Sequence, residues 1–246
     1  MTPPVFVCER YQLERDAVRL AGPEGRHATT VRRLAPGERV DLTDGAGLLA
    51  ECVVTAARPG ELDLAVLGRR SEPEPAFRVV VVQAILKGDR GELAAELMTE
   101  VGVDQLVPWA AERCIARWRP DREDKALARW RSSVLQAAKQ SRRYRFPEVT
   151  GQAQTTDVVE RVAAADAALL LDPAAPDALS ALVTGLPRAG EVVLIVGPEG
   201  GVGPAESDQL VAAGAVPARL GPSVLRGSSA GAVASAVVFS ACGGWA

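Results

Sequence analysis

Residues 190–213 contain an apolar run that stops abruptly at a glycine-rich turn. The run 192–196, VVLIV, is short and entirely apolar, which is typical of a buried strand, and the turn GPEGG at 197–201 follows it directly. Pro204 and Glu206 then occupy positions that favour the first turn of a helix. A strand that runs into a rigid turn and then into a helix is the repeating unit of α/β domains.

The same pattern recurs immediately downstream. Residues 215–220 form a second short strand-like run, Gly221 and Pro222 form a second turn, and the small residues of 228–241 suit a helix. Two such loops at the carboxyl ends of neighbouring strands expose main-chain N–H and C=O groups and create a ligand crevice. We therefore expect the chemistry of this protein to lie within residues 191–240.

The chain divides into two regions of different pattern. The first 70 residues contain short strand-like segments separated by Gly/Pro turns, with one short helix near 27–34, which predicts a small β-barrel. The segment SEPEP at 71–75 is a stiff polar linker. Beyond it strands and helices alternate, which predicts an α/β domain with a mostly parallel sheet. The expected domains are 1–71 and 76–246.

Charge is concentrated in one segment although the formal net charge of the chain is only -3. Residues 113–145 contain eleven Lys and Arg against three acids, a local net charge of +8, with Trp118, Trp130 and Tyr144 among them. Arginine suits bidentate phosphate contacts and stacking on bases, so this segment indicates a surface for a polyanion. The alternative is a solvated helix face, because residues 126–138 have the apolar spacing of a helix.

Other classes are disfavoured by composition. The four cysteines are scattered without CxxC spacing and there is one histidine, so a zinc site is not expected and no metal is predicted. The longest apolar runs are too short or too interrupted to span a membrane. Residues 1–15 do not resemble a signal peptide, and together with reduced thiols this indicates a cytoplasmic protein.

The glycine-rich turn does not fit the common phosphate-binding motifs. No Lys-Ser/Thr pair follows Gly201, as a P-loop requires, and Glu206 stands where a dinucleotide fingerprint needs its third glycine. Glu199 would also meet an approaching pyrophosphate. A ligand with a sulfonium or amine, ribose hydroxyls and an adenine edge suits these main-chain groups and one carboxylate better.

Two paired motifs resemble those of the SPOUT class of RNA methyltransferases, namely VGPEGG at 196–201 and LGPSVLR at 220–226. Four earlier segments are similar to the RsmE family within that class: QAILKGDR at 83–90, ELMTEVGV at 96–103, ERC at 112–114 and QAAKQSRR at 136–143. His27 and the segments VRR at 31–33 and PGE at 36–38 are similar to the PUA-like RNA-binding domain of the same family.

The resemblance implies a fold, an activity and partners. The fold is an α/β SPOUT domain with a deep trefoil knot, preceded by the PUA-like β-barrel. The activity is methylation of N3 of one uridine in 16S rRNA of the small ribosomal subunit, with S-adenosylmethionine as cofactor. The protein is expected to be a homodimer whose active site needs both subunits. The implied cofactor-binding residues are Leu171, Val196, Gly197, Pro198, Glu199, Gly200, Gly201, Leu220, Gly221, Ser223, Val224 and Leu225.

The chemistry then suggests catalytic and RNA-binding residues. Uridine N3 must lose a proton before it attacks a methyl group, so a positioned arginine would stabilise the imide anion. Arg226 and Arg143 are the candidates, although Arg226 could instead bond its own loop and Arg143 a phosphate. Glu199 is a candidate base, and could also only position the loop. The expected RNA-binding residues are Arg32, Arg33, Lys87, Arg90, Arg113, Lys139, Arg142, Arg143 and Arg145.

The chain departs from the family pattern at three places. Gly227-Ser228-Ser229 stand where Thr-Glu-Thr or Thr-Ser-Thr is frequent, Lys139 stands where Glu is common, and Arg142 stands where Gly is common. The two charge changes favour RNA affinity. Two alternatives stay open: a SPOUT enzyme acting on another atom such as a ribose 2′-hydroxyl, and a non-catalytic RNA-binding protein.

Overall fold

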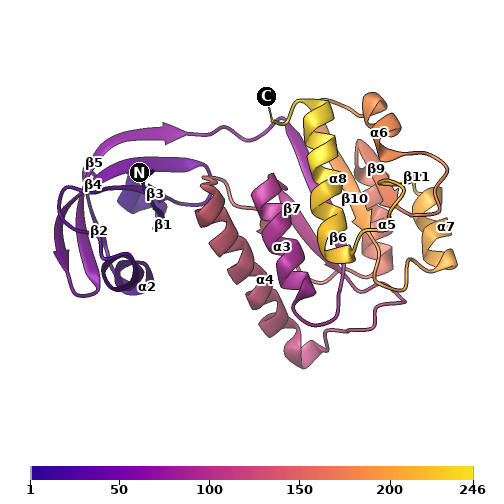
Figure 1. The fold of residues 1–246 in the computed structure, drawn as a ribbon, viewed down its shortest axis with the longest axis horizontal. Coiled ribbons are helices and arrows are strands. Elements are labelled where there is room, and N and C mark those ends of the chain that lie inside the picture. Colours follow the sequence, from indigo (N-terminus) through magenta and orange to yellow (C-terminus); the bar gives the residue numbers. More distant parts are fainter. Residues whose placement is uncertain (1, 246) are drawn as a thin grey trace. The chain divides into compact units, whose positions relative to one another are not determined.

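The computed structural model describes residues 2–245, and these form two compact units (Figure 1). The first unit comprises residues up to Glu74 together with Ala138–Phe146. The second comprises Pro75–Ala137 and the chain from Pro147 onward. Residues 138–146 therefore pack with the N-terminal unit, although they lie in the second half of the sequence.

The first unit is a five-stranded sheet in the order β1-β3-β4-β5-β2. Its strands are β1 (Val5–Val7), β2 (Ala17–Leu20), β3 (Arg39–Thr43), β4 (Leu48–Arg58) and β5 (Glu61–Ser71). Three short helices accompany them: α1 (Arg10–Leu13), α2 (Gly22–Arg26) and a π-helix (His27–Val31). The predicted strands are all present. Within residues 2–245 no main-chain hydrogen bonds pair β1 with β2. The strands predicted to close a barrel therefore form an open sheet, with β1 and β2 at its edges.

The segment 138–146 is held to this unit by main-chain and side-chain contacts. The C=O of Tyr144 accepts hydrogen bonds from Thr43 Oγ1 (3.1 Å) and from the N–H of Gly47 (2.8 Å). The N–H of Phe146 donates to the C=O of Gly45 (2.8 Å). A Cβ at Gly45, whose φ is 71°, would lie 2.8 Å from the Phe146 ring, so the close approach requires glycine.

Arg142 has a left-handed backbone (φ 61°) at the end of α4 (Pro120–Ser141). Residues other than glycine pay about 1 kcal/mol for this conformation. Arg142→Gly is therefore expected to raise the free energy of unfolding by about 1 kcal/mol in urea denaturation. Arg122→Gly, in the helical backbone of α4, should lower it by a similar amount. A destabilised Arg142→Gly would mean that side-chain contacts outweigh the strain.

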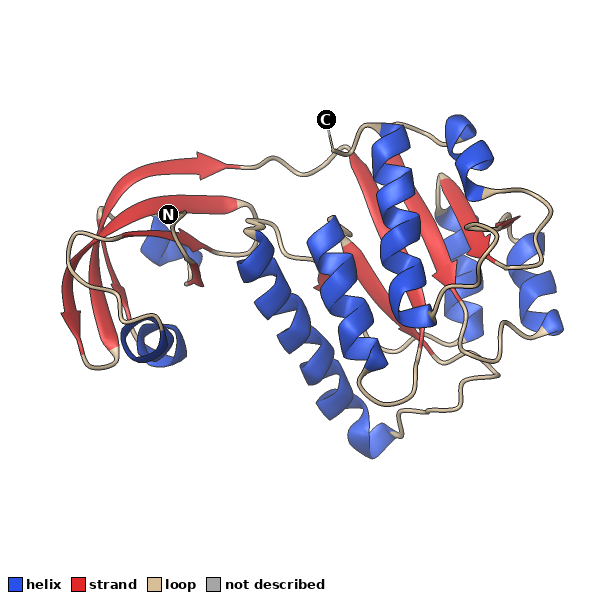
Figure 2. Cartoon of the chain, in the orientation of Figure 1, coloured by secondary structure: helices blue, strands red, loops and turns tan. Residues whose placement is uncertain are grey.

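The second unit is centred on a parallel sheet, whose strands are drawn in red in Figure 2. Its six strands lie in the order β11-β9-β10-β6-β7-β8. The strands are β6 (Phe77–Ala84), β7 (Gln105–Trp109), β8 (Glu148–Val149), β9 (Ala167–Leu171), β10 (Gly190–Val196) and β11 (Val216–Ala218). The continuous apolar runs of β6 and β10 follow from burial on both faces. The parallel sheet predicted from the alternation of strands and helices is confirmed.

Helices cover both faces of this sheet (Figure 1). Val79 and Val81 pack on one side with α3 (Arg90–Val101), α4 and α8 (Gly227–Cys242), and α6 (Leu179–Leu182) adds to the same core. Val80 and Val82 pack on the other side with α5 (Thr155–Ala164) and α7 (Pro204–Ala212). Of the helices in residues 2–245, none has the length and apolar character needed to cross a bilayer.

The four cysteines are free thiols, and burial raises the pKa of each. The pKa values of Cys8 and Cys52 rise to about 12, so their thiolates are scarce at neutral pH. Within the described residues no three metal-ligating side chains form a group that could hold an ion. The cysteines therefore act as small apolar side chains of the core.

Candidate active site

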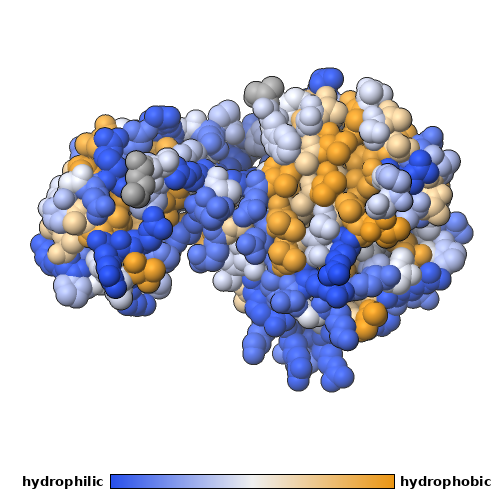
Figure 3. All heavy atoms as spheres, in the orientation of Figure 1, coloured by the Kyte–Doolittle hydropathy of each residue, from blue (hydrophilic) through white to orange (hydrophobic). Residues whose placement is uncertain are grey.

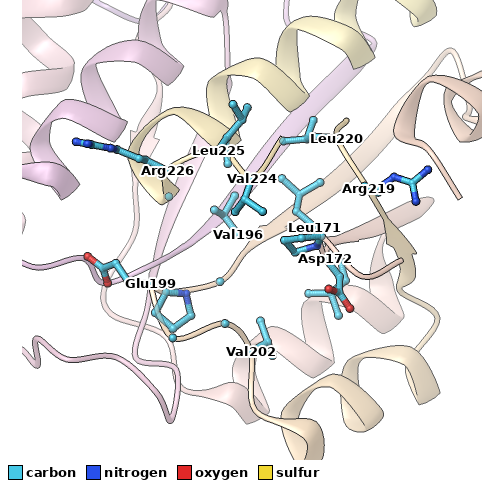
Figure 4. Close-up of a pocket in the computed structure, with 18 of the residues that line it drawn as sticks. Leu171, Asp172, Val196, Glu199, Val202, Arg219, Leu220, Val224, Leu225 and Arg226 are labelled. Carbon is cyan, nitrogen blue, oxygen red and sulfur yellow. The ribbon is translucent and has the colours of Figure 1, made fainter. Parts of the chain in front are cut away.

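A cavity of about 720 Å³ lies at the carboxyl ends of β9, β10 and β11 (Figure 4). It is lined by both glycine-containing turns, and all twelve residues that were predicted to bind the cofactor contribute to its wall. Arg90 and Arg226 line it as well. Its size falls within the usual range for small-molecule sites. The two turns are thus brought together in one cavity, and their role in binding stays a prediction.

The sheet register explains why the turns meet. Leu171 at the end of β9 is paired with Val196 of β10 on one side and with Ala218 of β11 on the other. The three strands therefore end level with one another, and each is followed by a loop at the same edge. This edge of a parallel sheet is where ligands of open α/β folds bind.

The first loop owes its shape to glycine. Gly201 has a φ of 71° and donates its N–H to the C=O of Pro198 (2.9 Å), which closes the turn. A Cβ at Gly197 would lie 2.8 Å from Val202 Cγ2, so no larger residue fits without a shift of the loop. The chain can therefore bring its backbone to the cavity wall without side chains in the way.

The second loop presents unused main-chain donors. Within residues 2–245, the N–H groups of Gly221, Ser223, Val224 and Leu225 donate no hydrogen bond to another protein group. The Val224 side chain is 75% exposed in spite of being apolar. Free N–H groups beside an apolar surface suit a planar ligand edge that carries acceptors, as an adenine ring does.

Glu199 connects the first loop to the segment that precedes α3. Its Oε1 accepts hydrogen bonds from the N–H of Lys87 (3.3 Å) and from Arg90 Nη1 (3.4 Å). The carboxylate therefore fixes the position of the glycine turn against Arg90. Two roles were predicted for Glu199, a catalytic base and a residue that positions the loop. These contacts favour the second role.

Arg226 is the N-terminal cap residue of α8, and its side chain lies on the same side of the cavity as Glu199 (Figure 4). Its C=O accepts from the N–H groups of Ser229 (2.9 Å) and Ala230 (3.0 Å). Within the described chain its guanidinium makes no hydrogen bond or ion pair, so the alternative in which it bonds its own loop is not seen. Ser228 is buried and does not cap the helix.

Family models match both units. Residues 72–239 match an RNA methyltransferase domain, and residues 20–67 match an RNA methyltransferase PUA domain. A protein of Mycobacterium bovis named ribosomal RNA small subunit methyltransferase E is 49% identical over 221 residues, which are 88% of this chain and 84% of that protein. The Bacillus subtilis protein of the same name is 26% identical, over 86% of this chain and 85% of its own length. The chain belongs to the ribosomal RNA small subunit methyltransferase E family.

Solved structures of this family and its relatives have the same fold over nearly their whole length. The ribosomal RNA small subunit methyltransferase E of Neisseria gonorrhoeae, bound to S-adenosyl methionine, has a TM-score of 0.85 at 27% identity. The match covers 97% of this chain and 98% of that one. A methyltransferase of Legionella pneumophila in complex with SAM has a TM-score of 0.86 at 25% identity, with 98% of each chain covered.

The RNA-binding residues predicted for this methyltransferase E family member fall into two groups. Arg32, Arg33, Lys139, Arg142, Arg143 and Arg145 belong to the first unit, and Lys87, Arg90 and Arg113 belong to the second. Arg113 Nη1 donates to the C=O of Gly200 (3.5 Å), which places it beside the glycine turn. Arg145 Nη2 donates to the C=O of Glu72 (3.0 Å).

Lys139 requires a correction. Its side chain is only 9% exposed, and Nζ donates to both carboxylate oxygens of Glu24 (2.7 and 2.8 Å). The ammonium also lies 5.5 Å from the centre of the Phe6 ring. This lysine therefore anchors the end of α4 inside the first unit and is not free for a phosphate. Sequence spacing missed this because the partner lies 115 residues away.

A buried carboxylate supports the same loops, a role that the sequence did not predict for it. Glu206 is 6% exposed, and its Oε1 accepts hydrogen bonds from the N–H of Glu112 (2.9 Å) and from Thr155 Oγ1 (2.6 Å). Its Oε2 accepts from the N–H of Gly203 (3.4 Å). Glu206 thus joins the first turn of α7 to the segment carrying Arg113. Only its helix-start position was visible in the sequence.

Proposed function

We propose that this protein transfers a methyl group from S-adenosylmethionine to N3 of a specific uridine in 16S rRNA of the small ribosomal subunit. The observation that carries the proposal is the convergence of both glycine-containing turns on one cavity, in a chain 49% identical to a protein named for small-subunit rRNA methylation. The SAM-bound relatives support the choice of cofactor. A ribosomal substrate implies that the protein acts in the cytoplasm.

The residues of the cavity fit such a cofactor. Close approach at Gly197, four free N–H groups from Gly221 to Leu225 and apolar side chains such as Leu171 and Val224 suit a nucleoside with an amino-acid tail. When bound there, the cofactor supplies a methyl group activated by a positive sulfonium. The loops hold it, and Val224 and Leu225 offer apolar side chains at the cavity wall.

Arg226 is the residue best placed to act on the uridine. Removal of the N3 proton leaves negative charge on the ring carbonyls, and a guanidinium without protein partners can donate to them. Glu199, on the same side of the cavity (Figure 4), binds the N–H of Lys87 and the guanidinium of Arg90. Arg143 keeps its proposed role as a second arginine, or as a phosphate contact, in the first unit. Further RNA contacts are proposed for Arg32, Arg33, Lys87, Arg90, Arg113, Arg142 and Arg145.

A trefoil knot is part of the proposal. β11 pairs with β9 on the side away from β10, whereas α8, the next element, packs against β10, β6 and α3. The chain therefore has to return across the end of β9 between residues 219 and 226. This crossing supports a threaded connection at the cavity.

A homodimer is proposed from a stripe of apolar and small residues on α8. Ser229, Val233, Ala236, Val237 and Ser240 are at least partly exposed at helical spacing, and Val233 is 42% exposed. Figure 3 shows apolar residues gathered over α8 on this face of the second unit. Contiguous apolar surface of this kind is typical of an interface between subunits. A second copy of the chain is the proposed occupant.

Val233→Glu is expected to shift the protein from dimer to monomer, because a charge would be buried in the interface. Light scattering coupled to size exclusion measures the mass directly. Glu160→Gln, an exposed position on α5, serves as the control and should leave the mass unchanged. A dimer that persists in Val233→Glu at micromolar concentration would place the interface elsewhere.

The decisive experiment is methylation of 30S particles from a strain that lacks this enzyme, with labelled donor, followed by nucleoside analysis. Labelled 3-methyluridine is the expected product. A 2′-O-methylated nucleoside would favour the alternative SPOUT chemistry. Absence of label, with RNA binding retained, would favour the non-catalytic alternative.

A further inference from the structure

Asp172 places a carboxylate on the wall of the cavity, directly after the last residue of β9. Its Oδ1 accepts a hydrogen bond from the N–H of Ala174 (2.8 Å), which fixes the side chain. Within residues 2–245 its Oδ2 has no hydrogen-bond or ion-pair partner. The side chain is thus oriented by one oxygen and has the other available to a ligand.

The other charged groups of the cavity wall are mostly engaged. Glu199 receives the N–H of Lys87 and the guanidinium of Arg90. Arg219 Nη1 donates to the C=O of Ala175 (3.2 Å). Asp172 and Arg219 lie on the side of the cavity opposite Glu199 and Arg226 (Figure 4). Asp172 is therefore the acidic acceptor that is available on that side.

An ionised carboxylate only accepts hydrogen bonds, so the ligand atoms facing Asp172 must be donors. The free N–H groups of the second loop suit the opposite type of ligand atom, the ring nitrogens of a base or a carboxylate. A ribose offers two neighbouring hydroxyl donors. In open α/β sheets an acidic residue at the end of one strand can bind a ribose hydroxyl while the glycine-rich turn after a neighbouring strand holds the rest of the ligand.

We propose that Asp172 binds a ribose hydroxyl of the nucleoside cofactor through Oδ2 and is a side-chain determinant of its recognition. The inference rests on the proposed function, because it requires a nucleoside in this cavity. In this arrangement the ribose lies on the Asp172 side of the cavity, and the methyl group to be transferred faces Arg226.

A ligand-based double-mutant cycle tests this without an activity assay. Calorimetry would compare wild type and Asp172→Asn with S-adenosylhomocysteine and with its 2′-deoxy and 3′-deoxy analogues. S-adenosylhomocysteine is used because it lacks the sulfonium charge, which a carboxylate would attract at long range. Asp177→Asn, an exposed position in the same loop and outside the cavity wall, is the matched control.

Loss of either partner should weaken binding by about 10- to 100-fold, the usual range for a hydrogen bond to a charged group. In Asp172→Asn the hydrogen bond is already lost, so removing the hydroxyl should cost no further affinity. This variant should therefore bind at least one deoxy analogue as tightly as it binds S-adenosylhomocysteine. Asp177→Asn should behave as wild type. Thermal denaturation checks that Asp172→Asn is folded.

Two results would overturn this inference and leave the proposed function intact. The first is an Asp172→Asn variant that binds S-adenosylhomocysteine as tightly as wild type does. The second is that the loss of affinity from Asp172→Asn multiplies with the loss from removing the hydroxyl, for both deoxy analogues. The same comparison with 5′-methylthioadenosine, which lacks the amino-acid tail, tests the ammonium group. If Asp172→Asn weakens binding of S-adenosylhomocysteine but not of 5′-methylthioadenosine, Asp172 binds the ammonium group and the ribose assignment is overturned. If wild type binds neither S-adenosylmethionine nor S-adenosylhomocysteine, the proposed function itself fails.

Discussion

Arg226→Ala is expected to lower kcat for rRNA methylation by about 100-fold, the loss typical when one donor to a developing anion is removed. Affinity for S-adenosylmethionine should stay nearly the same, because the loops that line the cavity supply main-chain groups and the guanidinium makes no hydrogen bond with them in the structure. Single-turnover methylation of 30S particles measures the first quantity, and calorimetry measures the second.

Arg226→Lys is the matched variant, since it keeps the charge and loses the planar fork. A partial recovery of kcat is expected if the residue stabilises the imide anion. Unchanged kcat in Arg226→Ala would remove this residue from the mechanism. A parallel loss of cofactor affinity would assign it to binding.

Glu206→Ala is expected to lower the free energy of unfolding by about 3 kcal/mol, because it leaves the N–H of Glu112, the hydroxyl of Thr155 and the N–H of Gly203 without their shared acceptor. For a chain of this size that corresponds to a decrease of roughly 6–12 °C in Tm. Differential scanning calorimetry gives both values.

Asp208→Ala, an exposed position on the same helix, is the control and should change stability by less than about 0.5 kcal/mol. Glu206→Gln keeps one acceptor oxygen and should cost about 1 kcal/mol. A stable Glu206→Ala would mean that water replaces the carboxylate and that this network does not support the loops.

Local patterns predicted most elements of the fold. The apolar run before Gly197 became β10, and the helix predicted to begin at Pro204 became α7, because hydrophobic spacing and proline geometry act between near neighbours. The motifs at 196–201 and 220–226 identified the residues that now line one cavity. The short α1 and β8 were not predicted, since four and two residues carry little periodicity.

Charge counting was less reliable than motif reading. The +8 of residues 113–145 predicted a surface for RNA, yet Lys139 is bound to Glu24, and Arg129 pairs with Glu92 (3.0 Å). A formal charge says nothing about the distance to an opposite charge elsewhere in the chain. The predicted domains also missed a contact between distant segments. Residues 138–146 pack with the N-terminal sheet, although the sequence placed them in the second domain.

The sequence by itself determined the two architectures, the positions of the strands and turns, and the family, since each depends on residues that are close together along the chain. The tertiary structure decided that β9 lies between β10 and β11, and that the turns after β10 and β11 share one cavity with Asp172. It also decided that Glu206 joins three segments and that Lys139 is buried. These features depend on contacts between residues 25 to 115 positions apart, whose free energy appears only when the sheet is assembled.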